Sequence, residues 1–310
     1  MSQPTTPRTH EHATGTTGDR EHWLVVGDDR SQSGHGVWSW VAAQPWAGWR
    51  VTVVTAQPPK DGAPSELAVP HPWDPEPARE LSQADVPVEH VVAEADPRVV
   101  LDRYDTADLI VIGPRGPGLL KRLHLGSTAE WLVSGHRPLS PVLIARSSEP
   151  VRSVLVCTDG SPGAADAVHT LAAMPLVRGV GVTVLGIDTP QGEAGDAVLD
   201  AARELRAAGS GEVRTLLVGA VPLTTPLDVR PTILGQVERT EPDLVVLGTR
   251  GLSGLRRAVL GSTAPAVVRH ARCSVLVGRA DDQARHADDP APHASPQVSE
   301  SADPPGAQMS

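Results

Sequence analysis

The sequence predicts an α/β protein of two tandem doubly wound domains, each a five-stranded parallel sheet with helices on both faces. Three observations lead to this prediction. The 310 residues suit two domains better than one. Short apolar runs alternate with helical stretches, which is the pattern of a parallel sheet covered on both faces. The whole pattern then occurs a second time, and right-handed crossovers fix the hand of each unit.

Five segments of the first copy predict buried strands, because each is short, apolar and bounded by turn residues. They cover residues 23–27, 48–56, 88–94, 107–113 and 140–146. The pattern also predicts a helix over residues 35–44. Residues 57–80 are rich in proline and polar side chains, so we expect a long surface loop there.

The second copy repeats this order of elements. Its predicted strands cover residues 154–158, 179–187, 212–220, 242–248 and 273–279, the third being the weakest pattern. Helical stretches lie between them at residues 164–174, 195–208 and 262–271.

Two alignments relate the copies. Asp159 falls on Asp28 at an offset of 131 residues, and the stretch "IVIGPRGPGLLKRLHLGST" matches "VVLGTRGLSGLRRAVLGST" at an offset of 135 residues. We therefore expect one duplicated domain over residues 21–147 and 150–280. Residues 1–20 and 281–310 lack apolar periodicity, and we expect both tails to be disordered.

The composition excludes several classes of function. A formal net charge of −10 argues against a nucleic-acid partner, because phosphate backbones need a basic stripe. No apolar run approaches the ~20 residues of a membrane span, and the start lacks a secretory apolar region, so we expect a cytoplasmic protein. Two cysteines give no disulfide framework and no zinc motif, and a metal site stays unknown.

The repeated glycine-rich loop is a candidate phosphate site. Gly248 ends the fourth strand of the second copy, where ligands of open parallel sheets bind. Gly251 follows, and residues 261–263, Gly-Ser-Thr, come just before a predicted helix. A helix N-terminus presents N–H groups and partial positive charge, which suit a phosphate, and Arg250 adds a cation. The alternative is that the glycines only serve turns.

Asp159 is the second candidate, because it follows the first strand at the same edge of the sheet. Its carboxylate can accept hydrogen bonds from a ribose hydroxyl or a base amine. The alternative is that Asp159 only caps the following turn.

These motifs resemble those of tandem universal stress proteins. The resemblance covers nearly all of residues 21–280, and the Gly-x2-Gly-x9-Gly-Ser/Thr spacing is similar to that of the ATP-binding branch of the family. It implies a five-stranded parallel fold related to other adenine-nucleotide binders. It also implies dimerisation through the fifth strands, either as an internal pseudo-dimer of the two domains or as a further homodimer between chains.

Carried over by position, the resemblance implies ATP, with or without Mg²⁺, as the ligand. The residues implied in the second copy are Cys157, Thr158, Asp159, Ile187, Leu247, Gly248, Gly251, Gly261, Ser262 and Thr263. Those in the first copy are Val26, Gly27, Asp28, Ala56, Ile112, Gly113, Gly116, Gly126, Ser127 and Thr128. Arg250, and Arg115 at the same place in the first copy, are added from the chemistry of the loop and not from the resemblance.

The first copy departs from this pattern in its turn and in its loop. Asp29 and Arg30 stand where the turn usually has glycine and serine, and an inward-pointing acid would repel phosphate. Pro114 and Pro117 each remove one N–H donor from the loop. We therefore expect the second site to bind better than the first.

Three functions follow from these observations. The favoured one is an ATP-binding regulatory protein of the stress response without strong catalytic activity, in which nucleotide shifts a conformational population. The second is a slow Mg²⁺-dependent ATPase or phosphoryl transferase, which would need a base or a positioned water. The third is an interaction module whose loops no longer bind.

Overall fold

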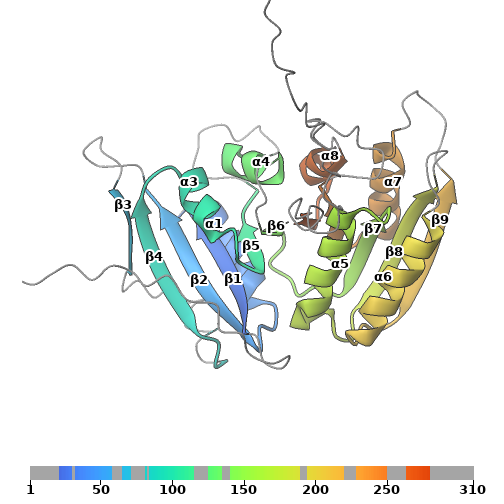
Figure 1. Cartoon of the computed structure of the whole chain (residues 1–310), viewed down its shortest axis with the longest axis horizontal. Coiled ribbons are helices and arrows are strands. Elements are labelled where there is room, and N and C mark those ends of the chain that lie inside the picture. Colours follow the sequence, from blue (N-terminus) through green and yellow to red (C-terminus); the bar gives the residue numbers. More distant parts are fainter. Residues whose placement is uncertain are drawn as a thin grey trace, which may run out of the picture. The chain divides into compact units, whose positions relative to one another are not determined.

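The strands of both copies form one continuous sheet of 11 strands, in the order β3-β4-β2-β1-β5-β6-β11-β10-β7-β8-β9 (Figure 1). All of them belong to one unit, residues 1–280. The computed structural model describes residues 21–29, 32–57, 65–70, 81, 84–114, 125–134, 140–188, 194–219, 228–249 and 263–279. The two tails predicted to be disordered lie outside these residues.

The described residues of the first copy contain the five predicted strands and one more. Its elements are β1 (His22–Asp28), α1 (Gln32–Ala42), β2 (Trp49–Ala56), β3 (Ser65–Pro70), β4 (Val88–Glu94), α3 (Pro97–Leu101), a 3₁₀ turn (Asp102–Tyr104), β5 (Leu109–Ile112), α4 (Ser127–Ser134) and β6 (Val142–Ile144). Strands β4, β2, β1, β5 and β6 are parallel neighbours.

Strand β3 corrects the prediction of a long surface loop over residues 57–80, of which residues 57 and 65–70 are described. It pairs antiparallel with β4 and ends one side of the sheet. Proline-rich composition hides such a strand from sequence analysis, because proline is tolerated at sheet edges but reduces the strand signal.

The described residues of the second copy show the same order without the added strand. Its elements are β7 (Ser153–Thr158), α5 (Pro162–Ala173), a 3₁₀ turn (Pro175–Val177), β8 (Gly181–Asp188), α6 (Gly195–Ala207), β9 (Val213–Gly219), α7 (Arg230–Thr240), β10 (Leu244–Gly248), α8 (Thr263–His270) and β11 (Ser274–Gly278). Strands β11, β10, β7, β8 and β9 are parallel neighbours.

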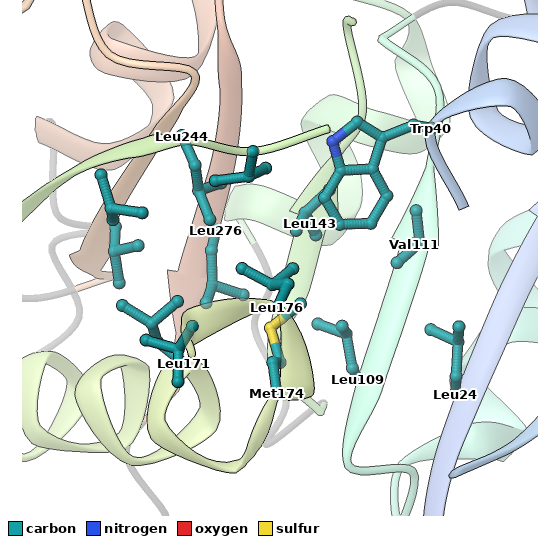
Figure 2. Close-up of a cluster of buried hydrophobic side chains, with 14 of the residues drawn as sticks. Leu24, Trp40, Leu109, Val111, Leu143, Leu171, Met174, Leu176, Leu244 and Leu276 are labelled. Carbon is teal, nitrogen blue, oxygen red and sulfur yellow. The ribbon is translucent and has the colours of Figure 1, made fainter. Parts of the chain in front are cut away.

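Side chains from both copies share the core. On one face of the sheet, α1 packs on the first copy, and α5 and α6 pack on the second. Figure 2 shows Trp40 and Leu109 of the first copy in the same cluster as Leu171 and Met174 of the second. The opposite face is covered by α3, α4, α7 and α8. None of the helices in the described part of the chain has the length and apolarity to cross a bilayer.

The two fifth strands pair with each other, as expected for an internal pseudo-dimer. β6 and β11 run antiparallel with Leu143 opposite Leu276. Arg146 N–H donates to Ser274 Oγ at 3.1 Å, and its guanidinium donates to the Val268 carbonyl. Glu130 of α4 forms an ion pair with Arg269 of α8.

This pairing also corrects one expectation. β6 lies between β5 and β11, and β11 lies between β6 and β10. Both edges of each fifth strand are therefore occupied within one chain, so a further homodimer through the fifth strands has no strand edge to use.

Hydrogen bonds at the start of each first strand fix how the copies align. Trp23 N–H donates to Asp108 Oδ2 at 2.8 Å, and Ser153 N–H donates to Asp243 Oδ2 at 2.9 Å. The return bonds, from Asp108 N–H to Trp23 O and from Asp243 N–H to Ser153 O, are both 3.0 Å long. Trp23 is therefore equivalent to Ser153. The register of the two first strands thus differs by one residue from the sequence alignment, which used an offset of 131 residues.

This register corrects three equivalences. Asp29, not Asp28, takes the position of Asp159. Asp28 takes that of Thr158, and Gly27 takes that of Cys157. The alignment from sequence fails because it matches one aspartate with another, whereas the true register is set by strand pairing.

Candidate functional site

The order of strands creates one switch point in each copy. From β7 the chain moves to β8 on one side, and it later returns to β10 on the other side of β7. In such sheets the crevice beyond the carboxyl ends of the two diverging strands is where ligands bind. In the second copy this crevice lies where β7 ends at Thr158 and β10 ends at Gly248. Two of the predicted site residues are thus brought together.

Asp159 organises the turn that follows β7. Its Oδ1 accepts the N–H of Ser161 at 3.0 Å, and the buried Thr158 hydroxyl accepts the N–H of Gly160 at 3.3 Å. Gly160 has a φ of +76°, a backbone conformation that glycine adopts without strain. Ser161 then caps α5, since its Oγ accepts the N–H of Ala164. Asp159 therefore caps this turn, as the alternative to a ligand-binding role predicts.

Gly248 has a packing role that sequence reasoning does not predict. A β-carbon on Gly248 would lie 2.5 Å from Ala164 N and 2.6 Å from Gly163 C, both in the first turn of α5. Glycine is therefore needed here so that the backbone of α5 can approach β10. The expectation that this glycine admits a ligand now has a competing physical explanation.

An apolar wall lies on the α7 and α8 face of the same edge. Cys157 and Leu247 are buried, and Ile187 at the end of β8 is half-buried against the same cluster. Burial raises the pKa of the Cys157 thiol to about 12, so this side chain is a neutral, weakly polar surface. Of these three side chains, that of Ile187 is the one that remains partly exposed at this edge.

The glycine loop itself is only partly described. Thr249 N–H donates to Gly278 O at 3.1 Å, and α8 begins at Thr263, as the helix pattern predicts. Arg250, Gly251, Gly261 and Ser262 lie outside the described residues, so their proposed contacts stay predictions.

The first copy brings a different set of groups to its switch point between β1 and β5. Asp28, at the position of Thr158, is buried. The space beside Gly27 is occupied by Ile112, whose Cγ2 would lie 2.8 Å from a β-carbon added to Gly27. Arg30 takes the position of Gly160 and lies outside the described residues.

The first-copy loop differs as well. Gly126 N–H donates to the Pro114 carbonyl at 2.7 Å, which ties the end of the loop to its beginning. Gly113 is half-buried, and α4 begins at Ser127 with Thr128 following. Val26 lies buried on the opposite, α1 face, whereas Ala56 keeps its equivalence to Ile187. Arg115 and Gly116 fall outside the described residues.

No metal centre accompanies these groups in the part of the chain that the structure describes, because no three His, Cys, Asp or Glu side chains gather there. Sequence reasoning did not single out Gly160 and Ser161, which form the turn beside the switch point. The signal for both was present, since "TDGSPG" combines a turn glycine with an N-cap serine and an N1 proline.

Comparisons with known proteins agree with the duplicated fold. The sequence matches the model of a family described as "Universal stress protein family" over residues 23–146 and again over residues 150–279. A universal stress protein of Mycolicibacterium smegmatis is 27% identical over 202 residues, which are 60% of this chain and 66% of that protein. One of Methanocaldococcus jannaschii is 50% identical over 40 residues, 13% of this chain and 24% of that protein.

The matched regions therefore span less than two thirds of these relatives. Among solved structures, a universal stress protein from Archaeoglobus fulgidus aligns with a TM-score of 0.59 at 19% identity, over 84% of this chain and 100% of that one. This likeness supports the fold alone.

Proposed function

Since this chain belongs to the universal stress protein family, we propose that its second copy binds ATP and that the protein acts as a nucleotide-dependent regulator of the stress response. Binding would order the glycine loop and shift the population of conformations that partners recognise. We place this activity in the cytoplasm.

One observation carries the proposal: the Asp159 turn and the end of β10 meet at the switch point of the sheet. The residues around it fit an adenine nucleotide. The half-buried Ile187 offers an apolar surface for the base, and the buried Cys157 and Leu247 belong to the same cluster. The carboxylate of Asp159 can accept from ribose hydroxyls. The start of α8 at Thr263 supplies N–H groups for phosphate.

The chemistry favours binding over turnover. Phosphoryl transfer needs a base or a positioned water. Asp159 is the base that the sequence offers, and its Oδ1 already accepts the Ser161 N–H. When Mg²⁺·ATP is bound, the metal would neutralise phosphate charge, and the chain's own residues would orient the nucleotide.

Calorimetric titration of the full chain with Mg²⁺·ATP tests the proposal. We expect one binding event per chain. Asp159→Asn should weaken it about tenfold or more, because a hydrogen bond to a charged group contributes about 1.5–3 kcal/mol. The matched control is Asp29→Asn, the equivalent position of the first copy, which should leave the affinity unchanged.

Two other results would favour the alternatives. Steady phosphate release that is lost in Gly261→Val would support a slow ATPase or phosphoryl transferase. Absence of heat at every nucleotide concentration, with wild-type stability intact, would leave an interaction module with vestigial loops and overturn the proposal.

A further inference from the structure

The described sheet ends in β3 on one side and in β9 on the other. These end strands differ in regularity. β3 shifts register between Ser65 and Val69 and ends in Pro70, and both features oppose the addition of another strand. β9 pairs in regular parallel register with β8 over its whole length, from Val213 to Gly219. β9 is therefore the end at which this sheet can be extended.

The backbone groups of β9 that face away from β8 can be identified from one hydrogen bond. Val182 N–H donates to the Glu212 carbonyl at 2.8 Å, so Glu212 faces β8. Because this direction alternates along a strand, Thr215, Leu217 and Gly219 turn their N–H and C=O groups outward. We call these three residues the β9 edge. The preceding outward carbonyl, that of Val213, accepts from Arg206 Nη2 at 3.0 Å.

We propose that two copies of this chain dimerise through their β9 edges, paired antiparallel about a two-fold axis at Leu217. In this register Leu217 lies opposite the second copy's Leu217, and Leu216 lies opposite the second copy's Val218. Thr215 lies opposite the second copy's Gly219. Directly opposed apolar side chains stabilise a strand pair, and these pairs occur on both faces of the sheet.

The charges at this end of the sheet are compatible with the register. Glu212 and Arg214 form an ion pair with each other at 2.7 Å, and both precede the residues that would pair. The uncharged β9 edge is thus left for pairing, whereas edge strands that avoid association commonly carry inward or central charges.

Exposed apolar side chains gather beside the same edge. In the described part of the chain, the exposed large hydrophobic residues are Val99, Leu199 and Leu217, at 53%, 53% and 50% exposure. Leu217 Cδ1 lies 3.9 Å from the β-carbon position of Gly195, and Leu199 is one helical turn further along α6. A second copy seated on the β9 edge would cover both leucines.

The sheet already contains two antiparallel edge pairings that serve as precedents. β3 covers β4, the first-copy equivalent of β9. β6 and β11 pair about Leu143 and Leu276, two equivalent leucines of the two copies, in the same way that Leu217 would pair with itself. Two-fold pairing of one surface with itself is also the commonest form of oligomer.

Sedimentation velocity over a concentration series tests the proposal. We expect the wild-type chain to dimerise. Leu217→Lys should raise the dissociation constant of the dimer about tenfold or more, because like charges would stand directly opposite. Thr215→Pro should do the same, because it removes an outward N–H and leaves the β8 ladder intact. Far-UV circular dichroism and thermal unfolding would show that both variants fold.

Val99→Lys is the matched control, since Val99 is as exposed as Leu217 and lies on α3 of the first copy; its dimer should be unchanged. Leu217→Cys in a Cys157→Ser, Cys273→Ser background should form an intermolecular disulfide on oxidation, because opposed antiparallel residues lie about 5.5 Å apart between α-carbons. Val99→Cys should not. A wild-type chain that stays monomeric, or a dimer that neither Leu217→Lys nor Thr215→Pro weakens, would overturn the proposal.

Discussion

The carboxylate of Asp243 holds Ser153 at the start of β7: Oδ2 accepts the Ser153 N–H at 2.9 Å and the Ser153 hydroxyl at 3.0 Å. The same oxygen also accepts the Arg152 N–H at 2.9 Å. Its first-copy equivalent, Asp108, accepts the Trp23 N–H at 2.8 Å. An aspartate placed just before β10, and just before β5 in the first copy, thus holds the start of the neighbouring strand.

Removal of this carboxylate should destabilise the fold. We expect Asp243→Ala to lower the free energy of unfolding by about 2–3 kcal/mol, because several donors lose a charged acceptor at once. Asp108→Ala should also destabilise the fold, by at least about 1 kcal/mol. Urea unfolding of both variants measures these losses. Losses below about 0.5 kcal/mol in both variants would show that these bonds do not hold the starts of the strands.

Gly248→Ala should destabilise the protein even without nucleotide. The added β-carbon would meet backbone atoms of Gly163 and Ala164, which cannot move without shifting α5. We expect a loss of about 1–3 kcal/mol, as for other overpacked sites. Gly235→Ala is the control, because a β-carbon at this position in α7 meets nothing within 4 Å. It should stabilise the protein by up to about 1 kcal/mol.

The outcome for Gly248 separates two explanations of the glycine. Unchanged stability of Gly248→Ala in the absence of nucleotide, together with weakened ATP binding, would favour close approach of a ligand. Lost stability in the apo protein would favour packing of α5. Thermal unfolding with and without Mg²⁺·ATP provides both readouts.

Local patterns are sufficient to predict most strands of this fold. Residues 88–94 and 242–248 are examples, because a short apolar run bounded by turn residues has few other structures available. β3 could not be predicted in this way, since its pairing with β4 is a tertiary interaction in a proline-rich segment. The helix Arg230–Thr240 likewise has no clear signal in the sequence, because its apolar periodicity is weak.

The candidate site could also be predicted only in part from the sequence. Asp159 and Gly248 could be placed at one edge because strand ends in a parallel sheet coincide. The position of α5 against Gly248 could not be predicted, because it depends on how a helix packs across two strands. The alignment of Asp28 with Asp159 fails for a different reason, since the register is visible only in the strand pairing and in the hydrogen bonds of Trp23 and Ser153.

Gln44 connects the end of the first helix to the segment between the copies. Its Nε2 donates to Trp40 O and to Glu149 O, both at 3.2 Å, and its Oε1 accepts the Val151 N–H at 3.1 Å. The side chain is buried. Gln44→Ala should therefore lower the free energy of unfolding by about 1–3 kcal/mol, because buried donors and acceptors lose their partners.

Gln44→Glu provides a comparison that keeps the size of the side chain. It retains an acceptor for Val151 but cannot donate to the carbonyls unless protonated, so it should destabilise at least as much at neutral pH and less in acid. Chemical unfolding at two pH values measures this. If neither variant changed the free energy of unfolding, the hydrogen bonds of Gln44 would have no structural role.

The two thiols should make the protein less stable in alkali. Burial raises the pKa of Cys157 to about 12 and that of Cys273 to about 11, whereas the unfolded thiols titrate near 9. Between these values the folded chain retains protons that the unfolded chain has lost. The stabilisation is therefore complete below pH 9 and is lost as the pH rises toward the folded values, by about 1.4 kcal/mol per pH unit for one group.

Cys157→Ser removes the titrating group and nearly keeps its volume. We expect the slope of unfolding free energy against pH to flatten between pH 9 and the folded pKa of about 12, compared with the wild-type chain. Alkylation with iodoacetamide adds an independent readout: the half-buried Cys273 should react before the buried Cys157, and both faster as the pH rises. Rapid modification of Cys157 at neutral pH in the folded protein would show instead that this thiol is reachable and ionised.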